Sequence, residues 1–392
     1  MTIRAFARRV TTSAGYLITP KIQHSPKVHT RVLGDEAHYF VGYHDHDPIS
    51  ADGTQILCHR ISRRFTNSIE PECGEIGFLC ISTGKFSALA TVSALNWQLG
   101  SRVQWFDDQT VIFNDLKDSK HCSKVINCRS GEVINTIPWA FWAISPDRQL
   151  GVSLNFAVLK EKRAGYGYTG ASPDGTRDIL RIYELNGHRI VAEFSLADVI
   201  SQLDIECSEN DEGYFNHICW NPASTKFITV VCWKSVRLNK RLIYGVQFNL
   251  SKGSIKLLNT SGFFSHHTWL SDEKIVAYLE VNGRKGYYVR QDEDIWRALN
   301  CTFPREDGHP TTVEPDKAVV VDTYPDKFSR MRLFRCSLDL EVKYEELLVV
   351  TNNPKFTGPL RCDLHPRFSV PHQRIVCDMP SYDTRKILVV DS

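Results

Sequence analysis

The sequence predicts an all-β fold, a seven-bladed β-propeller of four-stranded antiparallel blades. One phrase recurs along the chain: a histidine or aromatic residue, a Ser or Pro, a turn residue such as Asp, and then a β-rich run. Seven segments fit this phrase, at a mean spacing of roughly 53 residues that suits one four-stranded blade with its loops. Few windows sustain the period of an amphipathic helix, and residues 195–204 are the main exception.

The seven copies follow one another through the chain. They are "HDPISADGTQILCHR" (46–60), "RVQWFDDQTVIFND" (102–115), "FWAISPDRQLGVSLN" (141–155), "FNHICWNPASTKFITVV" (215–231), "SHHTWLSDEKIVAYL" (265–279), "DGHPTTVEPDKAVVVD" (307–322) and "CDLHPRFSVPHQRIVCD" (362–378). Between them, runs such as "IGFLCIST" and "KVINCRS" end at Gly turns, as a β-meander requires. The alternative all-β fold, a two-sheet sandwich, would rarely repeat one phrase seven times.

The sequence predicts an N-terminal arm over residues 1–26, followed by the propeller domain over residues 27–392. The run "KVHTRVL" (27–33) could supply a strand to the last blade and close the ring. The start of the chain lacks the apolar core of a signal peptide, and no run is apolar enough for a membrane span. We therefore expect a cytoplasmic protein with a solvated arm. The alternative is an organelle transit peptide, which the Arg-rich, acid-free start resembles.

Charge and motifs exclude several function classes. Lys and Arg number 47 against 45 Asp and Glu, so no overall field attracts nucleic acid or an acidic membrane. The sequence has no Walker loop, no Gly-x-Ser-x-Gly elbow and no His-Glu-x-x-His helix. The twelve cysteines include no C-x-x-C pair. Cys58, Cys232 and Cys377 lie within strand-like runs, which predicts buried structural thiols.

The register of the phrase places histidines at equivalent positions in most blades. Six or seven residues before each turn stand His46, Arg102, Phe141, His217, His266, His309 and His365. Rotation about the propeller axis relates these positions, so the side chains converge on one mouth if this strand is the inner one. Further polar residues gather at the same end: His44, Asp45, His267, Asp307, Arg361 and Asp363. Alternatively, each histidine supports its own blade corner by bonding a turn of the neighbouring blade.

Three of the phrases resemble those of the oligogalacturonate lyase family and its propeller relatives in polysaccharide metabolism. They are "RCDLHPRFSVPHQRIVCD", "SHHTWLSDEKIVAYL" and "DGHPTTVEPDKAVVVDTYPD", so the resemblance covers roughly the second half of the chain. It implies a seven-bladed propeller that cleaves uronate oligosaccharides by β-elimination, with a divalent metal held by histidines on the funnel face. Imidazole with carboxylate suits Mn, Fe or Zn.

The resemblance also implies a ligand set. His365 matches one ligand histidine of the family's last blade, and Asp363 stands where the other histidine would be. The family's glutamine has no counterpart near Leu360 or Arg361. The ligand from an earlier blade falls on His309 or on the pair His266 and His267, and the sequence leaves that choice open.

β-Elimination at a uronate needs a neutralised carboxylate, a base and an acid. A metal held by His309, Asp363 and His365 would act as Lewis acid, with His267 as a further candidate ligand. Arg361 or Arg102 could clamp the carboxylate, and His217 or His266 could be the base. Tyr324 is the candidate acid. Hydrolysis by paired carboxylates drawn from Asp45, Asp307 and Asp363 is the other option.

Substrate-binding residues are expected at the same mouth. The segment "EKRAGYGYTGASPDGTRD" (161–178) interrupts the propeller between predicted blades three and four. It suits a loop over the mouth, with Tyr166 and Tyr168 stacking on sugar rings, although an ordinary inter-strand loop is the alternative. His44, His46 and Tyr324 complete the predicted set.

The sequence therefore predicts a metal-dependent lyase-like propeller that acts on acidic oligosaccharides. The alternative is a non-catalytic propeller that binds a glycan or a protein partner in polysaccharide biosynthesis. Convergence of His217, His266, His309 and His365 around an open site would favour catalysis.

Overall fold

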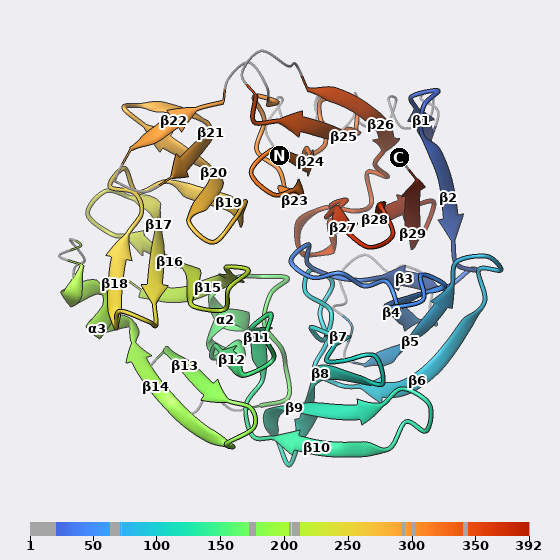
Figure 1. Cartoon of the computed structure of the whole chain (residues 1–392), viewed down its shortest axis with the longest axis horizontal. Coiled ribbons are helices and arrows are strands. Elements are labelled where there is room, and N and C mark those ends of the chain that lie inside the picture. The colour runs from blue at the N-terminus through green and yellow to red at the C-terminus, as the bar shows by residue number, and fades with distance from the viewer. Residues whose placement is uncertain are drawn as a thin grey trace.

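The computed structural model is a ring of seven blades around a central axis (Figure 1). It describes residues 21–62, 71, 73–171, 178–203, 205, 212–291, 295–299, 303–339 and 344–391. Within these residues, seven sheets each contain four or five antiparallel strands, and two short α-helices lie outside them. The predicted fold class is confirmed.

The first three blades are meanders in chain order. Blade 1 contains β3 (His38–Phe40), β4 (Gln55–Ile61), β5 (Gly74–Cys80) and β6 (Phe86–Val92). Blade 2 contains β7 (Gln104–Trp105), β8 (Thr110–Lys117), β9 (Lys120–Asn127) and β10 (Val133–Ile137). Blade 3 contains β11 (Phe141–Ile144), β12 (Leu150–Ser153), β13 (Ile179–Glu184) and β14 (Arg189–Ser195).

The remaining blades continue the ring. Blade 4 contains β15 (Glu212–Trp220), β16 (Lys226–Ser235), β17 (Lys240–Asn249) and β18 (Ser254–Leu257). Blade 5 contains β19 (Phe264–Trp269), β20 (Lys274–Val281), β21 (Arg284–Gln291) and β22 (Trp296–Ala298). Blade 6 contains β23 (Thr311–Glu314), β24 (Ala318–Asp322), β25 (Arg330–Ser337) and β26 (Glu345–Thr351), and blade 7 contains β27 (Arg367–Ser369), β28 (Arg374–Ser381) and β29 (Thr384–Asp391).

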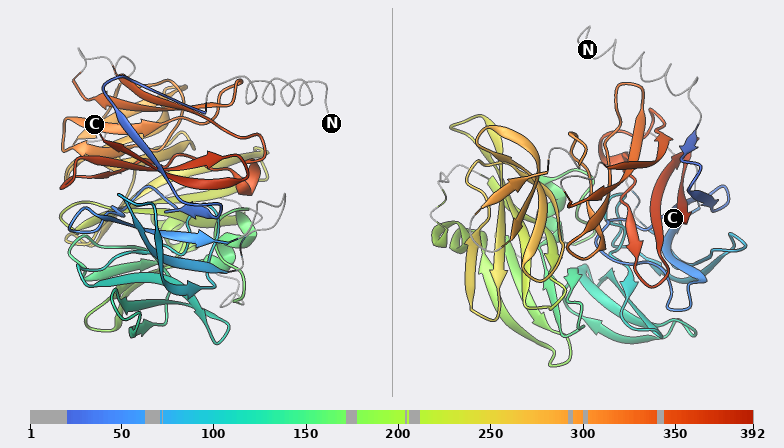
Figure 2. Two further views of the ribbon diagram at one scale, coloured as in Figure 1. Left: turned by 90° about the vertical axis from the view of Figure 1, so that its right-hand side faces the viewer. Right: turned by 45° about the horizontal axis from the view of Figure 1, so that its top comes forward.

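The N-terminal region closes the ring. β2 (His29–Leu33) pairs antiparallel with β29 and becomes the outer strand of blade 7, as predicted for residues 27–33. β1 (Ile22–His24) pairs with β26 and adds a fifth strand to blade 6. Figure 2 shows these strands running along the C-terminal strands at the side of the ring. The last residues of the predicted arm therefore belong to a sheet, and residues 1–20 lie outside the described part.

The first strand of each blade is the inner one. In Figure 1 these strands surround the axis, and β15, β19, β23 and β27 contact one another in sequence. The turn after the inner strand explains the repeated phrase. In blade 1, the carboxylate of Asp52 accepts hydrogen bonds from the Ser50 hydroxyl (2.6 Å) and the Thr54 amide (3.0 Å). Asp147 makes the same contacts in blade 3 with Ser145 and Gln149, so Ser-x-Asp fixes the turn that leads into the second strand.

Two helices interrupt the strands. α3 (Leu196–Gln202) begins at the Ser195 cap within the predicted helical window. α2 (Phe156–Lys162) begins one residue after the Asn155 cap and opens an insertion between β12 and β13. The insertion therefore lies inside blade 3, which corrects the prediction that it separates blades three and four. The predicted boundary was wrong because β12 is followed by a helix and a loop before its partner strand returns.

The core lies between neighbouring blades. Trp142, Phe227 and Val231 are fully buried in its largest cluster, and Leu388 and Val390 are fully buried between blades 6 and 7. Cys58, Cys232 and Cys377 are buried free thiols, as predicted. Across the described segments, none of the helices is long and apolar enough to cross a membrane.

Candidate functional site

Histidines from four successive blades converge on the axis. The ring centroids of His217 and His266 lie 6.0 Å apart, those of His266 and His309 4.1 Å, and those of His309 and His365 4.3 Å. Tyr43 of blade 1 lies between them, 4.9 Å from His217 and 5.2 Å from His365. All five side chains are buried. The repeat register therefore brings the predicted imidazoles into one cluster.

Unusual backbone conformations aim several of these side chains at the axis. Arg102, His217 and His365 occupy equivalent positions and have φ values of 56°, 51° and 45°. At His217 the pairing of β15 with β16 shifts register, so this residue forms a β-bulge. A bulge changes the direction in which its side chain points. Left-handed conformations cost non-glycine residues of the order of 1–3 kcal/mol and are retained where the surroundings enforce them. Three such residues at one register mark this mouth as a candidate site.

His309, Asp363 and His365 form a group that could hold a metal ion. Their candidate ligand atoms all lie within 4.8 Å of one another, and the three side chains are buried. Nδ1 of His309 lies 2.9 Å from Oδ1 of Asp322, and Nδ1 of His365 lies 2.7 Å from the carbonyl oxygen of Gly42. Both oxygens accept a hydrogen bond from Nδ1–H, so in the neutral imidazoles both Nε2 atoms present lone pairs.

The two Nε2 atoms test whether the residues fit a metal. Nε2 of His309 and Nε2 of His365 are buried without a hydrogen-bond partner among the described residues. A buried acceptor without a partner costs about 1–3 kcal/mol. Metal-bound histidines ordinarily donate their other ring nitrogen to a carboxylate or a carbonyl, which is the arrangement seen for both residues. The donor set of two imidazoles and Asp363 therefore fits a divalent transition metal.

Asp322 organises the two ligand histidines from the end of β24. Its carboxylate accepts hydrogen bonds from the backbone amide of His309 (2.6 Å) and from the backbone amide of His365 (3.0 Å). Burial disfavours the imidazolium of His309, but the charge of Asp322 outweighs it and raises the pKa of His309. Burial and then the charge of His309 place the pKa of His365 well below its usual value. A metal at Nε2 would compete with protonation of His309.

His266 and Tyr324 stand beside this group. Nδ1 of His266 lies 3.1 Å from Oδ1 of Asp307, and its ring centroid lies 6.1 Å from that of Tyr324. Burial, followed by the charge of His309, lowers the pKa of His266, so the imidazole is neutral at pH 7. Burial and then the charge of Asp363 hold the pKa of Tyr324 well above 10, so the phenol keeps its proton.

Two arginines border the same mouth. Nε of Arg361 donates to Oδ2 of Asp363 (2.7 Å), and its Nη2 donates to the hydroxyl of Tyr166 (2.9 Å). The side chain of Arg361 remains 27% exposed. Arg163, just after α2, lies 3.9 Å above the ring of Tyr166 and 3.4 Å from Nε2 of His217. The mouth therefore carries two cations close to the histidine cluster.

Arg102 does not face a substrate, which corrects one predicted role. Its two terminal nitrogens donate to the two carboxylate oxygens of Asp45 at 2.9 and 2.7 Å, and its Nε donates to the carbonyl oxygen of Trp142. The side chain is 2% exposed. All of its donors are directed into the protein, so Arg102 anchors the segment that carries Tyr43 and Asp45.

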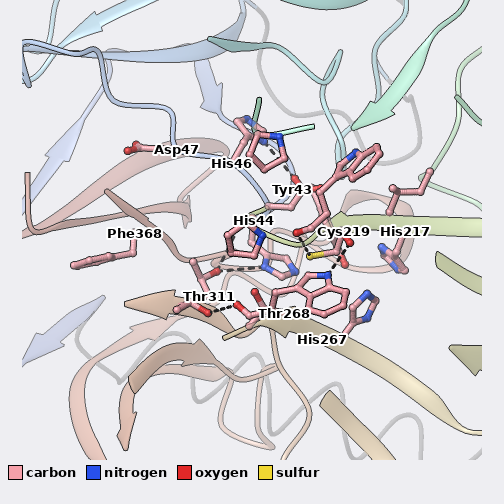
Figure 3. Close-up of a pocket in the computed structure, with 17 residues that line it drawn as sticks. Tyr43, His44, His46, Asp47, His217, Cys219, His267, Thr268, Thr311 and Phe368 are labelled. Atoms are coloured by element: carbon pink, nitrogen blue, oxygen red, sulfur yellow. Dashed lines mark hydrogen bonds and ion pairs between the residues drawn. The ribbon is translucent and has the colours of Figure 1, made fainter. Parts of the chain in front are cut away.

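His44, His46 and His267 contribute to a different pocket. This pocket of about 270 Å³ is lined by inner-strand residues, among them Trp220, Trp269 and Phe368, and it shares Tyr43 and His217 with the histidine cluster. Figure 3 shows His44 at its centre, between Asp47 and Phe368 on one side and His217 and His267 on the other. His44 also lies beside the histidine cluster, since its ring centroid is 5.2 Å from that of His309 and 6.1 Å from that of His365. The group that could hold a metal does not include His267, and His46 lines the pocket instead. The bulge between Phe264 and His267 sends His266 to the axis instead.

Tyr166 and Tyr168 are buried, which corrects the predicted stacking on sugar rings. Tyr166 is covered by Arg163, and only its hydroxyl reaches Arg361. Tyr168 stacks on Phe156 of α2 with a centroid distance of 4.6 Å. The rings hold the insertion against the propeller and have no face left for a ligand.

Sequence reasoning missed three residues of the site: Asp322, Arg163 and Tyr43. Asp322 had a signal, since it is the one charge in the buried run of β24. Arg163 lies in the insertion over residues 161–178. The residues next to it in the sequence do not distinguish it from an Arg or Lys on a surface loop. Tyr43 directly precedes His44. The path of this segment across the channel depends on how the ring closes, which the sequence does not show.

No protein-family model matches the chain, and no curated protein matches its sequence. Solved structures share its fold. An oligogalacturonate lyase in complex with manganese is 12% identical, with a TM-score of 0.62 over 95% of this chain and 98% of the lyase. The β-propeller domain of the Trilobed protease from Pyrococcus furiosus is 11% identical, with a TM-score of 0.51 over 91% of this chain and 96% of that domain. At these identities the likeness shows the propeller fold.

The same propeller likeness extends to a peptidase. The Pyrococcus horikoshii acylaminoacyl peptidase is 11% identical, with a TM-score of 0.51 over 90% of this chain and 50% of the peptidase chain. Because propellers carry unrelated functions, the chemistry of this chain has to be argued from its own residues.

Proposed function

We propose that the chain is a divalent-metal-dependent lyase-like propeller that cleaves uronate-containing oligosaccharides by β-elimination. The observation that carries the proposal is the pair of unpartnered Nε2 atoms of His309 and His365, each fixed by an acceptor at Nδ1 and directed beside Asp363. The manganese complex of a lyase of the same fold supports the choice of chemistry.

His309, His365 and Asp363 would hold the ion, with Asp322 behind them. A bound divalent ion supplies Lewis acidity, which neutralises the substrate carboxylate and makes its α-proton more acidic. Oδ2 of Asp363, which lies 3.9 Å from Nε2 of His365, also accepts a hydrogen bond from Nε of Arg361. The guanidinium of Arg361 is partly exposed and can pair with the same carboxylate.

His266 is the base in this proposal. Asp307 accepts a hydrogen bond from Nδ1–H of His266, which leaves the Nε2 lone pair for abstraction of the α-proton. The lowered pKa keeps His266 neutral at pH 7, and Asp307 would stabilise the imidazolium that forms. Of the two predicted bases, His217 is less suitable because its Nε2 already faces Arg163.

Tyr324 is the acid. Its raised pKa keeps the phenolic proton available for the leaving oxygen. The carbon–oxygen bond breaks as the α-proton is lost, so the products are an unsaturated uronate and an alcohol, with no water added. The convergence of four histidines also counts against the alternative in which each one supports its own blade corner.

The test is formation of a conjugated, unsaturated uronate, followed by ultraviolet absorbance during incubation with tri-galacturonate and Mn²⁺. We expect product with the wild type, a loss of at least 100-fold with His266→Gln, and unchanged rates with His372→Gln on the far side of blade 7. Cleavage that yields only saturated products, or none with any uronate oligomer after Mn²⁺ loading, would contradict the proposal.

A further inference from the structure

Arg163 is a partly buried cation without a counter-ion. Its guanidinium lies over the ring of Tyr166 and near Nε2 of His217. Within the described part of the chain, neither a carboxylate nor a backbone carbonyl accepts a hydrogen bond from this side chain. Another cation, Arg361, lies 5.7 Å from the ring centroid of Tyr166, and its charge repels that of Arg163.

Other buried arginines of this propeller are compensated. Arg102 pairs with Asp45, and Arg367 pairs with Asp378. Arg385 donates to the carbonyl oxygens of Trp97, Leu360 and Arg361. Taking a charge out of water without a partner is costly, so an exception beside the candidate site needs an explanation.

The insertion of blade 3 is built to hold this cation in place. Phe156 and Leu159 of α2 are buried, and the helix contacts β15. Gly167, at φ +72°, folds the chain back onto α2, where a Cβ atom would collide with the carbonyl oxygen of Phe156 and the backbone of Lys160. This turn sets Tyr166 under the guanidinium, so the orientation of Arg163 is fixed before any ligand arrives.

We propose that Arg163, with Arg361, forms an anion-binding site at the mouth that takes a carboxylate group of the substrate. Two planar guanidinium groups beside Tyr166, Arg163 over its ring and Arg361 at its hydroxyl, offer paired donors that match the two oxygens of a carboxylate. The identification of the anion as a uronate rests on the proposed function, whereas binding of the anion does not require the metal. The insertion thus selects acidic over neutral sugars.

The test uses the full-length protein, freed of metal with EDTA and then transferred to EDTA-free buffer, so that the outcome does not depend on metal. D-galacturonate and D-galactose are titrated by isothermal calorimetry into the wild type and Arg163→Met. The matched control is Arg181→Met, because Arg181 also covers an aromatic ring, that of Trp139, but is paired with Glu193. Arg163→Lys serves as a second variant if Arg163→Met does not fold.

We expect galacturonate to bind the wild type and Arg181→Met with the same affinity and galactose to bind at least tenfold more weakly. Arg163→Met should bind galacturonate at least tenfold more weakly. Arg163→Lys should show a smaller loss of affinity, because a single ammonium charge replaces the two parallel N–H donors of the guanidinium group. In anion-free buffer, Arg163→Met should melt no lower than the wild type, whereas Arg181→Met should melt lower. Unchanged galacturonate affinity in Arg163→Met or Arg163→Lys, or equal binding of galactose, would overturn the proposal.

The two proposals fail differently. Galacturonate binding that depends on Arg163 but is never followed by an unsaturated product would leave the anion site standing and contradict the lyase. Elimination that proceeds with unchanged KM in Arg163→Met would support the lyase and contradict the anion site.

Discussion

Asp322→Asn perturbs the buried carboxylate that fixes both ligand histidines. In the wild type, Oδ1 accepts from the amide and Nδ1 of His309, and Oδ2 accepts from the amide of His365. An asparagine oxygen can replace only one carboxylate oxygen, and its NH2 group then faces an N–H donor. With the oxygen on the His309 side, the buried amide of His365 loses its acceptor, at a cost of about 1–3 kcal/mol. The two bonds to His309 also change from charged to neutral, at about 1 kcal/mol each.

The variant should therefore lose about 3–5 kcal/mol of unfolding free energy and 10- to 100-fold in metal affinity, as expected when a supporting partner of a ligand is removed. Guanidinium chloride unfolding of the metal-free protein measures the first quantity, and Mn²⁺ titration followed by calorimetry measures the second. Asp326→Asn, on the loop after the same strand, is the control for a general charge effect. A loss below about 1 kcal/mol with unchanged Mn²⁺ affinity would refute the role assigned to Asp322.

Two further predictions concern stability. Burial raises the pKa of Asp178 to about 7. The folded state therefore retains a proton that the unfolded chain releases near pH 4. The contribution of this proton to the free energy of unfolding is complete below pH 4 and is lost as the pH rises through 7. Asp178→Asn should therefore remove a stability difference between pH 5 and pH 8 of about 3 kcal/mol, since about two pH units separate pH 5 from the folded-state pKa. Denaturant titration at both pH values measures it, and an unchanged difference would contradict the shift. Arg102→Met should lower the free energy of unfolding by about 3–5 kcal/mol, because it leaves Asp45 buried and unpaired. Arg102→Met with Asp45→Asn should recover part of that loss, and an additive double variant would argue against the pair.

The parts of the fold that the sequence predicts depend on the repeat. A tight turn follows the inner strand in each phrase, and at Asp52 and Asp147 the same Ser-x-Asp chemistry fixes it. Because rotation relates the blades, the register brings the segments that carry His266, His309 and His365 to one mouth. The group of His309, Asp363 and His365 follows from that geometry.

What the sequence could not predict depends on contacts between distant segments. Arg102 and His217 share a register, but Arg102 turns to Asp45, and a sequence pattern does not state which carboxylate lies nearby. A Gly- and Tyr-rich insertion has the same composition whether its rings are exposed or, as for Tyr168, packed on a helix. Similarly, one bulge in β19 decides that His266 and not His267 faces the axis.

Metal content of the purified protein, determined by elemental mass spectrometry after reloading with Mn²⁺, Fe²⁺ or Zn²⁺, tests the central claim most directly. The account predicts close to one ion for each wild-type chain. His309→Ala and His365→Ala should lose the ion while remaining folded, and His372→Ala should retain it. A wild type that binds no ion under any of these conditions, or ligand variants that keep it, would contradict the assignment of this mouth as a metal site.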